Sequence, residues 1–208
     1  MKHIIFNLAA MLLLSLFGTE NEQQPVESDA LTQYRDTLIG NFSGYGIDTL
    51  ICEPIDSLSK SEYEDDVYGG QHYKWRVYTK NNSVKPLIIE GTTGIHFVAE
   101  GDLDHNGTDE WGYVMEWPTS NWMNYNAFTN VKGKWLLIIP PVSIWLPHLD
   151  QEENEYYATM SVNDIIQPAG KKGFLKVRSS SISDDGVDFL IIENEVKIKP
   201  RKLRGCLK

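Results

Sequence analysis

Residues 102–110 read DLDHNGTDE, and this stretch places oxygen-bearing side chains at the first, third, fifth and ninth positions of a short loop. Gly107, at the sixth position, permits the positive φ of a sharp turn. Alternate residues of such a turn can all point inward, and a hard cation such as Ca²⁺ takes about six to eight oxygen ligands. The stretch therefore predicts a calcium loop. Its expected ligands, with a backbone carbonyl at the seventh position, are Asp102, Asp104, Asn106, Thr108 and Glu110.

The same frame of glycine, apolar and aspartate positions occurs three times, over residues 40–50, 101–111 and 180–190. Only the middle copy is acidic enough to hold a metal. All three keep a glycine at the sixth position and an aspartate at the eighth, and an aspartate there can accept hydrogen bonds from loop amides. We therefore expect three strand-loop-strand units with a common turn. These structural loop residues are Gly46, Asp48, Gly107, Asp109, Gly186 and Asp188.

The loop resembles the FG-GAP or VCBS type of repeat, found in integrin α-chain propellers and many bacterial secreted proteins, in which Asp-x-Asp-x-Asn-Gly-x-x-Asp/Glu joins two strands. The resemblance covers the short loop windows and implies a structural calcium ion in a β fold. The chain departs from the family in having Glu110 rather than Asp at the ninth position, and in having no clear Phe-Gly before the loop. Propellers have about four to eight blades, whereas about 165 residues at about 60 per unit supply fewer than three. We expect no complete closed propeller.

An acidic surface turn without an ion is the alternative to a calcium site. An EF-hand is excluded because the flanking segments are predicted to be strands and not helices.

Short β-rich runs separated by turn residues predict an all-β, mainly antiparallel fold whose Trp and Tyr residues fill much of the core. The one helical candidate is near residues 149–158. The expected strands lie at 49–54, 73–79, 84–90, 95–100, 110–117, 125–131, 135–140, 173–178 and 188–198.

The N-terminus reads as an export signal, because Lys2 precedes an apolar run of about 14 residues, shorter than the ~20 that a spanning helix needs. We expect an exported protein, in the periplasm, on the cell surface or secreted, with no transmembrane span in its mature form. An uncleaved anchor is the alternative. Such a signal with one FG-GAP-like loop also resembles small secreted proteins of the Bacteroides type. The predicted parts are a signal peptide at 1–18, a polar linker at 19–33, a β domain at 34–199 and a basic tail at 200–208.

The formal net charge of -10 disfavours binding to nucleic acid or to anionic membranes. The basic tail is predicted to be a solvated chain end. An exported protein could join Cys52 to Cys206. The alternative, which we favour, is that Cys52 is a small buried hydrophobic residue and Cys206 a free thiol.

Aromatic residues suggest where a ligand could bind. Most aromatic side chains in a β domain belong to the core, and Trp111, Tyr113 and Met115 share one face of their strand. The loop at 117–125 is unusually rich in aromatic and amide side chains. Its candidate ligand surface consists of Trp117, Asn121, Trp122 and Tyr125.

No catalytic motif is recognisable. The five histidines are scattered, and the chain has no Gly-x-Ser-x-Gly elbow and no glycine-rich phosphate loop. The sequence favours an exported, calcium-stabilised, non-catalytic binding or interaction module with a protein or glycan partner. The alternative is a polysaccharide-acting hydrolase or its accessory carbohydrate-binding module.

Overall fold

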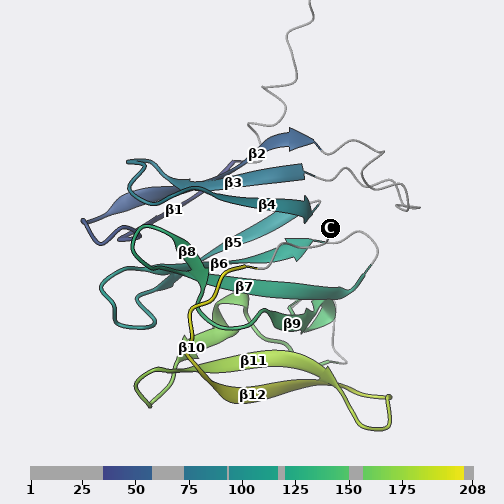
Figure 1. Ribbon diagram of the computed structural model, residues 1–208. Helices are drawn as coiled ribbons and strands as arrows, with labels where there is room; N and C mark the ends of the chain where they lie inside the picture. Colours follow the sequence, from purple (N-terminus) through teal and green to yellow (C-terminus); the bar gives the residue numbers. More distant parts are fainter. Residues whose placement is uncertain (1–34, 58–72, 93, 117–119, 150–156, 204–208) are drawn as a thin grey trace, which may run out of the picture.

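A computed structural model describes residues 35–57, 73–92, 94–116, 120–149 and 157–203. These residues form three antiparallel β-sheets stacked as layers (Figure 1). The sheets enclose no barrel and no propeller, so the predicted fold class is confirmed. In the described part of the chain the only helical elements are two short 3₁₀ turns, η2 (Leu146–His148) and η3 (Val162–Asp164).

Two of the sheets are built from neighbouring strands in sequence order. Sheet A has the order β1-β2-β3-β4, and sheet B has the order β5-β6-β7-β8 with β9 paired to β7. Sheet A contains β1 (Asp36–Gly40), β2 (Asp48–Ser57), β3 (Tyr73–Thr79) and β4 (Leu87–Thr92). Sheet B contains β5 (Gly94–Gly101), β6 (Glu110–Glu116), β7 (Trp122–Asn130), β8 (Trp135–Leu137) and β9 (Val142–Trp145).

Sheet C has the order β10-β11-β12 and contains β10 (Ile166–Pro168), β11 (Phe174–Ile182) and β12 (Phe189–Lys197). Sheet B lies between the other two, with one hydrophobic core on each of its faces. As predicted, Trp111, Tyr113 and Met115 of β6 share one face, which packs in the core toward sheet A. Val114 belongs to the core on the opposite face.

Gly112 of β6 leaves room for a side chain of β7 to pass over β6 and contact β5. A Cβ on Gly112 would lie 2.1 Å from the Tyr125 hydroxyl, so only glycine leaves room for that ring. The Tyr125 hydroxyl donates a hydrogen bond to Glu100 of β5. Burial raises the pKa of Glu100 to about 8. Three neighbouring strands are thereby joined by side chains as well as by their backbone ladder.

Several predicted boundaries differ from the structure. The strand expected at 84–90 begins at Leu87, and the one expected at 135–140 ends at Leu137. Three strands were not predicted: β1, β9 and β10. β1 is a short, largely exposed edge strand without apolar alternation, and β10 has three residues including a proline, so neither carries the usual strand pattern. Most of the helical candidate at 149–158 lies outside the described residues.

The backbone of the described part of the basic tail is attached to sheet B, whereas the side chains of Arg201 and Lys202 are exposed, as the prediction of a solvated end requires. Leu137 and Arg201 exchange backbone hydrogen bonds of 2.8 and 2.9 Å, and the Lys199 amide donates to the Ile138 carbonyl. Leu203 packs against the core toward sheet A. Residues 204–208, and with them Cys206, lie outside the described residues. Cys52 is buried in the core, and burial raises the pKa of its thiol to about 12.

Candidate metal centre

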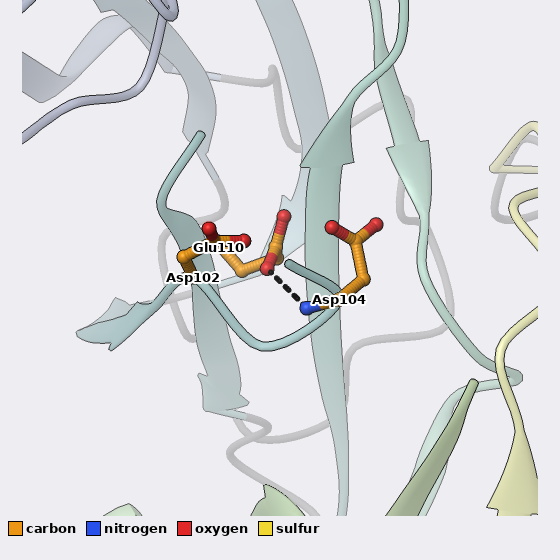
Figure 2. Close-up of side chains that lie close together, drawn as sticks. All are labelled: Asp102, Asp104 and Glu110. Atoms are coloured by element: carbon orange, nitrogen blue, oxygen red, sulfur yellow. Dashed lines mark hydrogen bonds between the residues drawn. The ribbon is translucent and has the colours of Figure 1, made fainter. Parts of the chain in front are cut away.

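The loop between β5 and β6 brings three carboxylates together (Figure 2). One carboxylate oxygen each from Asp102, Asp104 and Glu110 lies within 4.8 Å of the others. Asp102 and Asp104 are half-buried in the loop, whereas Glu110 is the first residue of β6 and is fully buried. Three of the five predicted ligands therefore come into one cluster.

The loop backbone orients the two aspartates. The Asn106 amide donates to Asp102 Oδ1 and to Asp104 Oδ1, each at 3.0 Å. The Gly107 amide donates to Asp102 Oδ2 at 3.1 Å. Gly107 has a φ of +88°, which is the left-handed conformation expected from the sequence. The turn thus holds both carboxylates on its inner side before any ligand arrives.

Glu110 combines deep burial with incomplete hydrogen bonding. Its Oε2 atom accepts hydrogen bonds from the amides of Leu103, at 2.7 Å, and Asp104, at 3.3 Å. Its Oε1 atom is buried and has no hydrogen-bond partner among the described residues. Burial, and then the nearby Asp104 carboxylate, raise the pKa of Glu110 to about 8. A cation beside these oxygens would offset both the burial and the repulsion.

The other two predicted ligands are engaged with each other. The Asn106 Oδ1 atom accepts hydrogen bonds from the Thr108 amide, at 2.7 Å, and the Thr108 hydroxyl, at 2.5 Å. The Asn106 side chain must give up these bonds to act as a ligand. The backbone carbonyl of Thr108 remains the ligand that the sequence pattern predicts for the seventh position.

A buried residue of β7 also contacts the cluster and was missed from the sequence. Thr129 Oγ1 donates to Asp104 Oδ2 at 3.3 Å and accepts from Asn106 Nδ2 at 2.9 Å. Thr129 lies 25 residues beyond Asp104, in a strand without acidic residues. No local motif marks it, because strand pairing alone brings it to the loop.

The loop at 41–47 is fastened to the acidic loop. Asp109 Oδ2 accepts from the Asn41 amide at 2.5 Å, and the Asp109 amide donates to the Asn41 carbonyl at 2.9 Å. Asn41 Nδ2 also donates to the Gly107 carbonyl at 2.8 Å. Asp109 therefore joins two loops, which differs from the predicted role of an acceptor within its own turn.

The three copies of the motif lie in three different sheets, at the β1–β2, β5–β6 and β11–β12 connections. The first two share a turn, since Asn41 Oδ1 accepts from the Gly46 amide as Asp102 Oδ2 accepts from Gly107. In the third, the Gly186 amide donates to the Ser183 carbonyl, which closes an ordinary hairpin turn. The predicted positive φ of the sixth-position glycine is therefore confirmed in all three copies, whereas the side-chain bond to its amide is shared by only the first two.

The aspartates at the eighth position have no common role. Asp48 accepts from the Thr49 amide at 2.8 Å and from the Asn81 amide at 3.3 Å. Asp188 is exposed, and within the described residues its carboxylate accepts no hydrogen bond. In this loop the Val187 amide donates to Asp185 Oδ1 and the Asp188 amide donates to Ser183 Oγ, so other side chains take the capping role that was predicted for Asp188.

The predicted ligand surface does not form as a unit. Tyr125 is fully buried in the core, so it cannot belong to an exposed surface. Asn121 is exposed and Trp122 is half-buried, with its ring 6.2 Å from that of Phe189. Trp117 lies outside the described residues. Tyr125 lies in the core and not at the surface because β7 is buried on both faces of sheet B.

A serine and a histidine that are distant in sequence meet inside the molecule. Ser180 Oγ lies 2.7 Å from His148 Nδ1 and accepts from the Trp145 amide at 2.8 Å. Both residues are buried, and no carboxylate of the described residues bonds to the pair. The contact joins η2 to β11. A hydrolytic triad also needs an acidic residue bonded to the histidine and a serine that a substrate can reach, and this pair has neither among the described residues.

Comparison with known proteins gave no match of the chain to a family model, to a curated protein or to a solved structure.

Proposed function

We propose that the loop at residues 102–110 binds a structural Ca²⁺ ion. The observation that carries this proposal is the fully buried Glu110 carboxylate, whose Oε1 atom has no partner among the described residues and belongs to a cluster with Asp102 and Asp104. Buried carboxylates are normally hydrogen-bonded, paired or bound to metal. A divalent cation supplies the missing partner and neutralises most of the charge.

The chemistry of the donors favours calcium over other metals. All the candidate ligand atoms are oxygens, whereas zinc sites draw mainly on cysteine and histidine. Three carboxylates on a loop and an adjoining strand also suit the variable coordination of Ca²⁺ better than the strict octahedron of Mg²⁺. The likeness of the loop to the FG-GAP type of repeat supports the same choice.

We further propose that the protein is an exported, non-catalytic binding or interaction module with a protein or glycan partner. The export signal at residues 1–18 supports this location, although that segment lies outside the described residues. No helix in the described part of the chain is long and apolar enough to cross a membrane. The buried Ser180–His148 pair offers no support for the alternative of a hydrolase.

Metal binding can be tested with two loop variants. Asp104→Ala removes a carboxylate from the cluster, and Asp185→Ala removes one from the β11–β12 hairpin as a matched control. Melting of the parent should rise with Ca²⁺, since a ligand at a hundredfold excess over its Kd stabilises by about 2.7 kcal/mol. Asp104→Ala should abolish this rise, and Asp185→Ala should keep it.

Elemental analysis and calorimetric titration of the same proteins provide the decisive readout. One calcium per chain is expected in the parent and in Asp185→Ala, and none in Asp104→Ala. An unchanged melting temperature with and without chelator, together with no bound metal, would leave the loop as a plain acidic turn.

A further inference from the structure

A second candidate site lies on sheet B, beside the attached tail. It is a groove of about 890 Å³, within the range of about 300–1,000 Å³ that is typical of small-molecule sites. Its floor includes Met115 of β6, Asn126 of β7 and Leu137 of β8, all buried. Met115 is five residues along β6 from Glu110, or roughly 17 Å at about 3.3 Å per residue. The groove is therefore separate from the acidic loop.

The wall of the groove is fixed in place by the backbone of the tail. The paired hydrogen bonds between Leu137 and Arg201, and the bond from Lys199 to Ile138, hold this segment alongside β8. Leu203 anchors its far end in the core. The cationic residues of the tail thus start from a fixed backbone and not from a free chain end.

The groove is cationic in a protein of formal net charge -10. Lys199, Arg201 and Lys202 line it and are exposed, and no carboxylate is among its described lining residues. Within the described part of the chain, none of the three forms an ion pair. Among the described residues their charges are unpaired, in contrast to Lys176 and Arg178, which both pair with Glu193.

A buried amide adds a polar contact on the floor. Asn126 is 3% exposed, and its side-chain amide makes one hydrogen bond to a described residue, a 3.4 Å bond from Nδ2 to the Asn124 carbonyl. A side-chain amide has two N–H donors and two acceptor positions, so most of its capacity remains unused. Asn124 also lines the groove and is exposed. Buried polar groups normally have partners, which a ligand in the groove would supply.

We infer that this groove binds a small acidic sugar, of about disaccharide size, through its carboxylate and hydroxyl groups. The lysines and the arginine pair with the carboxylate, and the two asparagines bond to the hydroxyls. Pro141 and Pro200, which are exposed apolar residues of the groove, contact the apolar face of the ring. The inference supplies a ligand class for the binding module proposed above, but it does not depend on the calcium ion.

The inference can be tested by calorimetric titration with digalacturonic acid. Its methyl ester is the matched neutral probe, and inorganic phosphate is an anion that lacks the sugar rings. The double variant Arg201→Gln/Lys202→Gln removes two charges from the groove. The control Lys132→Gln/Lys134→Gln removes two exposed charges from the hairpin between β7 and β8, away from the groove. Equal melting temperatures of the two variants will show that both remain folded.

We expect saturable binding of digalacturonic acid that weakens as salt is added, and about tenfold weaker binding by the groove variant. The control variant should bind as the parent does. Equal binding of the acid and its ester, binding of phosphate as tight as that of the sugar, or full affinity in the groove variant would overturn the inference. So would absence of binding by the parent. The calcium titration is a separate readout, so either proposal can fail without the other.

Discussion

Glu110 is the residue at which burial and charge conflict most directly. One of its oxygens receives two backbone amides, while the other is buried without a partner beside two aspartates. Removing a carboxylate from water costs several kcal/mol unless it is paired, so the side chain favours its protonated form. Either a bound cation or the loss of the negative charge of Glu110 would remove this conflict.

The change Glu110→Gln separates these two effects. The glutamine Oε1 can keep the two amide bonds and its Nε2 can donate to Asp102 or Asp104, so the variant should be more stable than the parent in chelator, by roughly 1 kcal/mol. It should show no stabilisation by Ca²⁺. Melting at pH 8 with chelator and with calcium will measure both, and Glu195→Gln, an exposed residue of β12, is the control. A variant that melts below the parent in chelator and still responds to calcium would contradict the ligand role of Glu110.

At the scale of elements, the β1–β2 and β5–β6 loops form one joined structure. Asn41 connects them through its backbone amide and carbonyl and through its side chain, which also closes the turn at Gly46. The acidic loop is thereby attached to the edge strand of sheet A. Ordering of one loop by an ion should therefore stabilise the other.

The variant Asn41→Ala tests this connection. It removes the side-chain bonds to Gly46 and Gly107 and leaves the backbone bonds to Asp109, so we expect a loss of about 1–2 kcal/mol in the free energy of unfolding and weaker calcium binding. Asp188→Ala, in the exposed hairpin of sheet C, should change stability by less than about 0.5 kcal/mol. Urea denaturation with and without calcium provides the values. Equal losses in the two variants would show that the loops do not act together.

Sequence patterns predicted what is local in these elements. The alternation of side chains along residues 73–79 predicted both ends of β3. The spacing of acidic residues in the loop predicted the three carboxylates that cluster. Contacts made by strand pairing could not be predicted in this way. Thr129 reaches the loop from β7, and Asn41 reaches it from sheet A, because the stacking of sheets and not the local chain places them there.

For the whole molecule, sheet B is shared by two cores, so its central strands are buried on both faces. This explains why Tyr125, which follows an aromatic loop, belongs to the interior. In the core between sheets B and C, Ser180 of β11 contacts His148, which is 32 residues away and follows β9 of sheet B. The layers are therefore expected to unfold together.

The connection through His148 should make the stability of the whole fold depend on pH. Burial lowers the pKa of His148 below its ordinary value of 6.5, so the folded protein takes up this proton less readily than the unfolded chain. The contribution of His148 is therefore present above about pH 6.5 and is lost as the pH falls below it. Glu100 and Glu110, with pKa values raised to about 8, act in the opposite direction and favour the folded state as the pH falls through 8.

The effect of His148 is isolated by comparing variants at each pH. His148→Gln has no proton to gain, so the difference in free energy of unfolding between the parent and this variant should shrink steadily from pH 7 to pH 5. The matched control variant is His96→Gln, which replaces an exposed histidine of β5. Urea denaturation at half-unit steps of pH measures the difference. A constant difference for His148→Gln would mean that the folded and unfolded states bind this proton equally, and that the link between sheets B and C does not sense pH.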